Sequence, residues 1–344
     1  MVTFARSGRN AERDGKTEGT RVTADREQGE TPAKSRLRIE ALDAARGLAL
    51  VAMATYHFTW DFEFFGYLEP GTATHGWLKI YARAIASTFL FLAGFSLVLA
   101  HYPVLRAGSF ARRLAVIVVA ALAITIATAI AVPEGMIFFG ILHAIAAASL
   151  IGLAFLRLPP LVTLAAAAAA IALPNLYRSE FFDEPALLFI GLSQHLPRSN
   201  DYVPLLPWAG ALLVGIAAAR LALSRGWLEG LARLPGGPGW LRLAGRHSLI
   251  VYLLHQPVLI AVVYVISIIA PPQKPDPIQS YLASCESACL AEGSPAEICN
   301  RFCACTLERL QQQSLLSPLQ SGAILPDKDA RIVELARECS AISQ

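Results

Sequence analysis

Long apolar runs separated by short polar stretches are the dominant pattern of this chain. A helix needs about 20 mostly apolar residues to cross a bilayer. Seven segments meet or approach that length, and the fifth is the shortest of them. They are 42–60, 80–100, 113–132, 136–156, 159–174, 204–223 and 247–270. The pattern predicts an all-α fold, a polytopic membrane helix bundle with about seven spans.

The first apolar segment carries four ionisable residues, Asp43, Arg46, His57 and Asp61. At about 100° per residue, and with Arg46 as zero, His57 falls near ~20° and both aspartates near ~60°. All four should therefore share one helix face, which we call the polar seam. A charged group facing lipid costs several kcal/mol, so the seam should face the protein interior.

The seam has a catalytic interpretation and a structural one. His57 and Asp61 lie one helical turn apart, so we expect them to hydrogen-bond, and a neighbouring carboxylate makes an imidazole a stronger base. We favour this function for the seam, with Arg46 in the same site. Alternatively, Asp43 and Arg46 only anchor one end of the helix while His57 and Asp61 mark the opposite interface.

Five sequence stretches together resemble a known family. They are LDAARGLALVAMATYHFTWD, STFLFLAGFSLVL, FFGILHAI, DYVPLLPWAGALLVGI and GRHSLIVYLLHQPVLI. Over about residues 38–270 the chain resembles the heparan-alpha-glucosaminide N-acetyltransferase catalytic family. The spacing from Arg46 to His57 is also similar to a motif of the wider membrane acyltransferase superfamily, acyltransferase family 3 included.

The resemblance adds a second candidate base. In the eukaryotic N-acetyltransferase the catalytic histidine precedes the second conserved helix, and the stretch after His75 is similar to that region. The resemblance implies a role for His75, although an ordinary loop histidine is an equally good reading. The choice between His57 and His75 stays open.

Charge is distributed unevenly between alternate loops. One side collects the basic start of the chain and most later arginines, and the other collects acidic residues such as Glu63, Glu69 and Asp183. The arginines are Arg106, Arg112, Arg113, Arg157, Arg220, Arg225, Arg233, Arg242 and Arg246. By the positive-inside rule we expect a multi-pass protein of the cell (inner) membrane, with the N-terminus cytoplasmic and the C-terminus external.

Composition supports this class. The chain of 344 residues is 55% hydrophobic and only 16% charged, and its net charge of +3 is too small to indicate nucleic-acid binding. Residues 1–38 hold nine Lys or Arg and a single aromatic residue, so we expect a disordered cytoplasmic tail. That tail lacks the features of a cleaved signal, so the first apolar helix should remain as an anchor.

All six cysteines follow residue 280, and we expect an external cysteine-rich domain over 273–344 after a transmembrane domain over 39–272. The spacings Cys285-x3-Cys289 and Cys299-x3-Cys303 place sulfurs one turn apart on two helices, the second starting at Ser294-Pro295. Pairing Cys285 with Cys303 and Cys289 with Cys299 leaves Cys305 for Cys339. A zinc site is the alternative.

Four residues in or near the later spans are candidates for binding substrate: His143, His255, Asp201 and Trp208. Each histidine could equally be a core residue whose hydrogen bonds are satisfied within the protein. Trp208 could equally anchor its helix at the membrane interface. Arg112, Arg113 and Arg246 could bind the phosphates of an acyl-CoA, although membrane topology alone would also place them there. We find no Walker A loop, no GxGxxG after a strand and no HExxH motif.

These observations predict a membrane acyltransferase. We expect an acyl group, acetyl first of all, to pass from cytoplasmic acetyl-CoA to a hydroxyl or amine of an external acceptor, a glycan or another small polar molecule. Membrane lipids are expected partners, nucleic acid is not, and homo-oligomerisation is left open. The alternatives are a transporter or lipid-binding protein that uses the seam as a proton relay, and a membrane anchor that displays the cysteine-rich tail.

Overall fold

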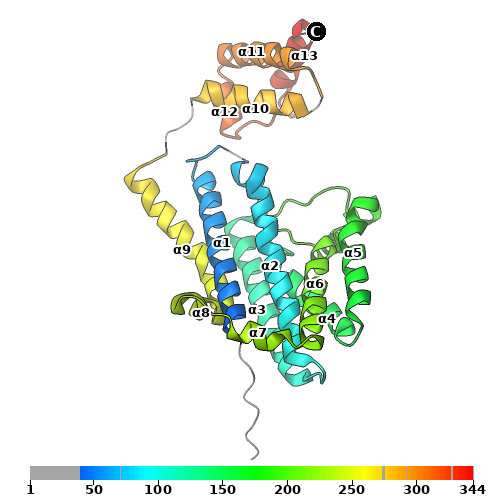
Figure 1. The fold of residues 1–344 in the computed structure, drawn as a ribbon. Coiled ribbons are helices and arrows are strands. Elements are labelled where there is room, and N and C mark those ends of the chain that lie inside the picture. The colour runs from blue at the N-terminus through cyan, green and yellow to red at the C-terminus, as the bar shows by residue number, and fades with distance from the viewer. Residues whose placement is uncertain (1–38, 70, 273–275, 292, 327, 344) are drawn as a thin grey trace, which may run out of the picture. The chain divides into compact units, whose positions relative to one another are not determined.

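A computed structural model describes residues 39–69, 71–272, 276–291, 293–326 and 328–343. The described residues form thirteen α-helices and four short 3₁₀ helices, and no strand occurs among them. The predicted all-α fold is therefore confirmed (Figure 1). The predicted tail over 1–38 lies outside the described residues.

Nine of the helices lie between residues 39 and 272. They are α1 (Glu40–Phe64), α2 (Gly76–His101), α3 (Ala107–Ala131), α4 (Ile141–Phe155), α5 (Pro160–Leu176), α6 (Leu205–Ser224), α7 (Trp227–Arg233), α8 (Gly239–Arg246) and α9 (Ser248–Ile269). The 3₁₀ helices are η1 (Thr72–Thr74), η2 (Pro133–Gly135), η3 (Glu180–Asp183) and η4 (Leu188–Ile190). Each of the seven predicted segments thus holds a helix, and the basic linker before α9 adds two short ones.

Four of these helices, α2, α3, α6 and α9, are long and apolar enough to cross a membrane by length and composition. Helices α4 and α5 are apolar but have only 15 and 17 residues. Helix α1 has 25 residues, but its ionisable groups lower its hydropathy. The number of spans, predicted as seven, therefore stays a prediction.

The largest core cluster lies where α2 meets α4, α5 and α6. Gly94 and Gly215 let α2 and α6 approach closely, because a Cβ at either position would come within 2.1 Å of a backbone oxygen on the other helix. Leu97 of α2 and Leu212 and Ile216 of α6 are fully buried, and the ends of their side chains meet at Gly152 of α4. The α2–α6 pair forms the rigid centre against which the remaining helices are placed.

Helix α1 packs mainly on α8 and α9 and, less extensively, on α2. Leu50 and Met53 of α1 form a small buried cluster with Ile85 of α2. Asp43 and Asp61 are buried as well, and Arg46 and His57 are half-buried. The polar seam therefore faces the protein, as its angular spacing predicted.

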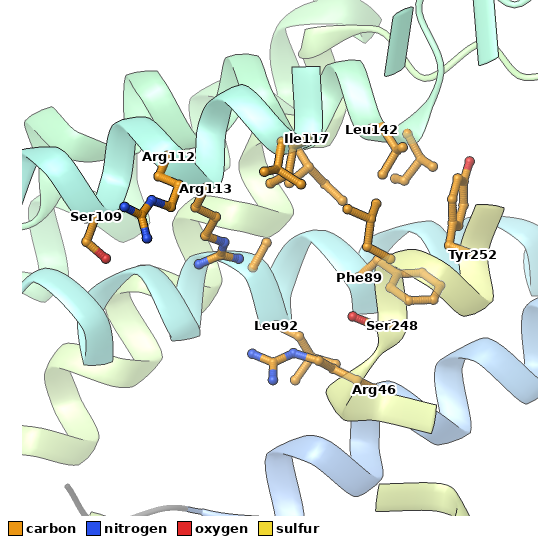
Figure 2. A pocket seen from close by; sticks show the side chains of 15 residues that line it. Arg46, Phe89, Leu92, Ser109, Arg112, Arg113, Ile117, Leu142, Ser248 and Tyr252 are labelled. Carbon is orange, nitrogen blue, oxygen red and sulfur yellow. The ribbon is translucent and has the colours of Figure 1, made fainter. Parts of the chain in front are cut away.

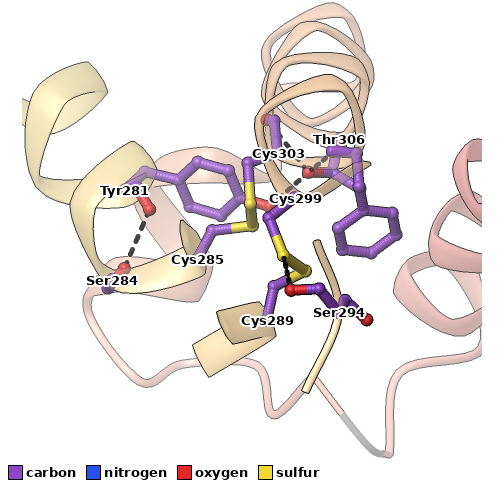
Figure 3. Close-up of a disulfide and its surroundings, with 9 residues drawn as sticks. Tyr281, Ser284, Cys285, Cys289, Ser294, Cys299, Cys303 and Thr306 are labelled. Atoms are coloured by element: carbon purple, nitrogen blue, oxygen red, sulfur yellow. Dashed lines mark hydrogen bonds between the residues drawn. A yellow bond between two sulfur atoms is a disulfide. The ribbon is translucent and has the colours of Figure 1, made fainter. Parts of the chain in front are cut away.

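Four helices follow residue 276 and pack on one another: α10 (Pro277–Ala291), α11 (Ala296–Gln312), α12 (Leu316–Gln320) and α13 (Ala330–Ser343). Disulfides join Cys285 to Cys303, Cys289 to Cys299 and Cys305 to Cys339, which confirms the predicted pairing. Figure 3 shows the first two bridges between α10 and α11. Helix α11 begins at Ala296, one residue later than the proline start expected from the sequence.

Candidate functional site

The first half of the polar seam is tied to two neighbouring helices by ion pairs and hydrogen bonds. Arg46 Nη1 lies 3.2 Å from Asp43 Oδ1, and Arg46 Nη2 donates to the Ser96 hydroxyl of α2. Asp43 Oδ2 lies 3.6 Å from Arg246 Nε of α8, and Glu40 pairs with Arg242 at 2.9 Å. These contacts fix the guanidinium of Arg46 between α1 and α2.

A cavity of about 480 Å³ opens beside Arg46 (Figure 2). Its polar lining includes Arg46 of α1 together with Ser109, Arg112 and Arg113 of α3. Its apolar lining comes from α2, α3, α4 and α9, and comprises Phe89, Leu92, Ala93, Val116, Ile117, Ile141, Leu142, Ile145, Leu249 and the ring of Tyr252. Along α3 the lining runs from Ser109 to Ile117, about 12 Å of helix.

The arginines make one end of this cavity strongly positive. Arg46 has Asp43 beside it, whereas Arg112 and Arg113 form no ion pair within the described part of the chain. In Figure 2 their guanidinium groups lie at the end of the cavity away from Tyr252. Guanidinium groups match phosphate oxygens in geometry and charge, so this end can bind a phosphorylated ligand. Arg246, predicted with them, contacts Asp43 and is absent from the lining.

The second half of the seam meets α9. The imidazole of His57 packs edge-on against that of His255, with ring centroids 4.9 Å apart. Asp61 Oδ1 accepts a hydrogen bond of 2.6 Å from Gln256 Nε2. The structure thus places His57 beside His255 and Asp61 beside Gln256.

The predicted hydrogen bond between His57 and Asp61 is wrong. Asp61 Oδ2 is buried and has no hydrogen-bond partner within the described residues, and its other oxygen is taken by Gln256. The two residues do share a helix face. Since α9 lies against that face, an amide from α9 reaches the carboxylate and a second imidazole turns toward His57.

Tyr252 connects the cavity to the histidines. Its ring lines the cavity at the end away from Arg112, and its centroid lies 5.5 Å from that of His255. Its backbone oxygen accepts a hydrogen bond of 2.5 Å from His255 Nδ1. A ligand that holds an anionic group at the arginines and extends along the apolar lining would therefore end at Tyr252, whose other contact is the ring of His255.

The loop that carries His75 is fastened to the same half of α1. Glu63 accepts hydrogen bonds from the backbone amides of Gly71 and Ala73, at 2.5 and 2.7 Å, and the Tyr56 hydroxyl donates to Ala73 O at 3.2 Å. His75 is exposed, and its Nδ1 bonds the carbonyl oxygen of Gly71 at 2.8 Å within its own loop. No contact joins His75 to His57 among the described residues, so its role stays a prediction.

His143 lies at the start of α4. Its Nδ1 accepts from the Gly140 amide at 3.3 Å, and its Nε2 lies 3.4 Å from the Thr125 hydroxyl of α3. These bonds satisfy both ring nitrogens. They explain the residue as part of the α3–α4 junction, and its predicted role in binding substrate remains untested.

Asp201, in the loop before α6, also serves this junction. Its Oδ2 accepts a hydrogen bond of 3.0 Å from the Ile141 amide in the first turn of α4. Burial raises the pKa of the Asp201 carboxyl to about 6, although this hydrogen bond opposes the change. Trp208 is half-buried and packs against the core cluster. Neither side chain lines the cavity.

The fold and the site define a class: an all-helical membrane protein with an arginine-rich, otherwise apolar cavity between its helices. A family model described as heparan-alpha-glucosaminide N-acetyltransferase, catalytic, matches residues 38–257, more than half of the 344 residues. The chain belongs to this family, which makes it a membrane protein and a transferase of the acetyltransferase class. Searches of the curated proteins and of the solved structures found no match.

Three residues of the site were not singled out from the sequence: Glu63, Tyr252 and Gln256. Gln256 and Tyr252 lie in the stretch YLLHQP around His255. Polar residues next to each other inside an apolar segment indicate a face that points into the protein, and this pattern could have identified them. Glu63 lies two residues after Asp61, at the end of the apolar segment. The two backbone amides that donate to Glu63 could not be foreseen, because they depend on how the following loop folds back.

Proposed function

We propose that this protein transfers an acetyl group from acetyl-CoA to a hydroxyl or amine of a polar acceptor, a glycan or a similar small molecule. The donor enters from the cytoplasmic side of the cell (inner) membrane, and the acceptor from the external side. The observation that carries the proposal is the cavity between Arg112 and Tyr252, which is positive at one end and apolar along its length, and whose far end is closed by the Tyr252 ring that packs on His255.

The lining suits a donor of this kind. The size of the cavity, about 480 Å³, is within the range of small-molecule sites. Coenzyme A combines phosphate groups with a long, less polar arm that ends in the thioester. Arg46, Arg112 and Arg113 would bind the phosphates, and the apolar side chains around Ile117 would line the path of the arm. The family in general uses acetyl-CoA as donor.

The orientation follows from the charge pattern. Arg242 and Arg246 meet the start of α1, and Arg220 of α6 bonds the Leu156 carbonyl oxygen and lies 4.0 Å over the ring of Tyr102. The start of α1, the end of α6 and helix α8 lie at the lower side of Figure 1. If that side is cytoplasmic, as the positive-inside rule predicts, the arginine end of the cavity is the one that meets cytoplasmic donor.

The test uses the purified full-length protein in detergent with radiolabelled acetyl-CoA and a panel of amino and hydroxy sugars. We expect thioester cleavage that increases with an acceptor, and label in the acceptor. Arg113→Ala should raise the KM for acetyl-CoA about tenfold or more, because a charged hydrogen bond to phosphate contributes about 1.5–3 kcal/mol.

Arg157→Ala is the matched control. Arg157 is an exposed arginine of the predicted cytoplasmic side and does not line the cavity. An equal rise in KM for both variants would mean that only general positive charge attracts the donor. If the wild-type protein neither cleaves acetyl-CoA nor transfers label, the proposal is contradicted and a non-enzymatic membrane protein is favoured.

A further inference from the structure

Helices α7 and α8 connect α6 to α9, and both of these longer helices meet the requirements for crossing a membrane. A connection between two spans lies at the membrane surface, because each of its ends continues into the bilayer. In Figure 1, α7 and α8 lie across the ends of the long helices, whereas α6 and α9 run along the bundle. We call residues 225–247 the connecting segment.

One face of each short helix is fixed to the protein. Leu228 and Leu231 of α7 pack against the largest core cluster. On α8, Leu241 and Gly245 lie against α1, where the two backbones come into close contact. The connecting segment is therefore held in place from the inside, and the side chains on its other faces are available to other molecules.

Large apolar side chains point away from these fixed faces. Trp240 and Leu243 lie three residues apart on α8 and are 62% and 56% exposed. Trp227 at the start of α7 and Leu234 just after its end are each 52% exposed. Tryptophan is enriched at membrane–water interfaces, where one end of its ring is apolar and the other polar. These side chains favour a segment that lies in the interface, as amphipathic surface helices do.

The connecting segment is also positively charged. It carries four arginines and a single acidic residue, Glu229. Two of the arginines pair with carboxylates of α1. The other two, Arg225 and Arg233, are exposed and form no ion pair within the part of the chain that the structure describes. The segment thus offers positive charge without a protein counter-charge, next to side chains suited to the interface.

We propose that the connecting segment is a binding surface for anionic phospholipids of the leaflet that it faces. Trp240 and Leu243 lie among the upper parts of the acyl chains, and Arg225 and Arg233 bind the headgroup phosphates. Arginine matches phosphate in geometry and charge. A lipid with a net negative charge is favoured over a zwitterionic one, because only the first gives the arginines an uncompensated anion.

Lipid bound here should also stabilise the fold around the cavity. Arg246 of the connecting segment contacts Asp43, and Asp43 in turn pairs with Arg46 at the cavity. A ligand that binds only the folded state stabilises that state. We therefore expect phosphatidylglycerol to raise the melting temperature of the full-length protein in neutral detergent, and phosphatidylcholine to raise it less.

The first experiment titrates short-chain phosphatidylglycerol into the full-length protein in neutral detergent and follows binding by tryptophan fluorescence. Short-chain phosphatidylcholine and inorganic phosphate are titrated in parallel, and both should bind more weakly. Arg233→Gln should weaken the binding of phosphatidylglycerol by about fivefold, the factor that one arginine contributes near an anionic surface. Arg233→Lys should retain most of the affinity, since it keeps the charge.

Arg157→Gln is the matched control. It removes one exposed arginine from the same predicted side of the membrane, but at the connection between α4 and α5. Its affinity for phosphatidylglycerol should stay within about twofold of wild type.

The second experiment places the protein in bilayer discs of phosphatidylcholine and phosphatidylglycerol, in which one lipid or the other carries brominated acyl chains. Bromine quenches tryptophan fluorescence on contact. Brominated phosphatidylglycerol should quench the wild-type protein more strongly than brominated phosphatidylcholine, and Trp240→Phe should reduce this excess. Trp77→Phe should leave it unchanged, because Trp77 lies in the first turn of α2, on the opposite predicted side.

The other outcomes overturn the proposal in different ways. Equal quenching by the two lipids would mean apolar contact without selection of a headgroup. Equal weakening by Arg233→Gln and Arg157→Gln would mean that only general positive charge attracts the lipid. Inorganic phosphate that binds as tightly as the lipid would mean a site for free anions. A change in oligomeric state with unchanged lipid affinity would assign the surface to a second copy of the chain. No readout requires turnover, so a failure of acetyl transfer leaves this inference standing.

Discussion

Gly47 of α1 and Gly245 of α8 lie face to face. A Cβ built on Gly245 would fall 1.8 Å from the carbonyl oxygen of Asp43 and 3.0 Å from the amide nitrogen of Gly47. A Cβ on Gly47 would fall 2.1 Å from the carbonyl oxygen of Leu241. The two glycines therefore let the backbones touch, and this contact brings Arg246 to Asp43, which in turn holds Arg46 at the cavity.

Gly245→Ala should destabilise the protein, because the methyl group meets backbone that cannot rotate away. We expect a loss of about 1–3 kcal/mol and a lower melting temperature in detergent, followed by tryptophan fluorescence. Gly239→Ala is the matched control, since nothing lies within 4 Å of a Cβ at that position in the same helix. Equal melting temperatures for the two variants would show that the close contact is not needed.

Glu63 should control the order of the loop that carries His75. Its carboxylate accepts both the Gly71 and the Ala73 amides, and Glu63→Gln removes the charge and one acceptor oxygen. Hydrogen exchange over 71–75, measured by mass spectrometry, should become about tenfold faster. If His75 takes part in transfer, turnover should fall in the same variant. Glu69→Gln, at an exposed carboxylate nearby, should change neither quantity.

Asp201 should make stability depend on pH. Its pKa is about 6 in the folded protein, above the ordinary value of 3.8, so the folded state binds this proton more tightly than the unfolded state. Stability from this group therefore increases as the pH falls through 6 towards 4, and is lost as the pH rises.

Asp201→Asn keeps an oxygen for the Ile141 amide and removes the titration. Relative to wild type it should gain on the order of 1–2 kcal/mol of stability at pH 7.5, and this advantage should shrink at pH 5. Thermal melts at both pH values measure the difference. Asp183→Asn is the control, and its change in stability relative to wild type should have the opposite sign, because the hydrogen bond from His195 lowers the pKa of Asp183. A pH-independent difference for Asp201→Asn would contradict the raised pKa.

The cysteines test the orientation of the chain. All six are paired in disulfides, so a maleimide should label native membranes only after reduction. If the C-terminus is external, an impermeant maleimide added outside should then label them. Labelling that requires access from the cytoplasm would reverse the predicted topology, and with it the side from which the donor enters.

Local sequence predicted the parts of this structure that depend on spacing within one segment. Apolar runs long enough for a helix gave helices, and cysteines one turn apart on two helices gave the observed bridges. The inward direction of the seam followed from its angles and from the cost of placing Asp61 in lipid. Helix α4 is shorter than its apolar run, because the chain is not α-helical before Ile141. The amide of Ile141, in the first turn of α4, donates to the Asp201 carboxylate.

Contacts between helices decided the rest. Within α1 alone His57 is the natural partner of Asp61, but the position of α9 supplies Gln256 instead. The cavity combines α1, α2, α3, α4 and α9, and no single segment shows that Arg46 and Arg112 share it. Helices α7 and α8 flank the Pro-Gly-rich stretch 235–238, and α8 packs on α1, which lies far away in the sequence.

Arg46 distinguishes donor binding from helix anchoring. Its guanidinium bonds Asp43 and Ser96 and also lines the cavity, so both roles fit its position. Arg46→Lys keeps the positive charge but loses the planar fork that can bind a phosphate and a neighbour together. If Arg46 binds the donor, the KM for acetyl-CoA should rise about tenfold, with a smaller change in kcat.

Ser96→Ala provides the matched comparison. It removes the bond that anchors Arg46 to α2 and leaves the guanidinium and its charge in place. For a donor-binding Arg46 we expect Ser96→Ala to raise the KM by no more than about threefold, well below the effect of Arg46→Lys. For an anchoring Arg46 both variants should lower the melting temperature by similar amounts and leave the KM unchanged. That second pattern would remove Arg46 from the donor site, and the site would then depend on Arg112 and Arg113, whose guanidinium groups have no carboxylate partner among the described residues.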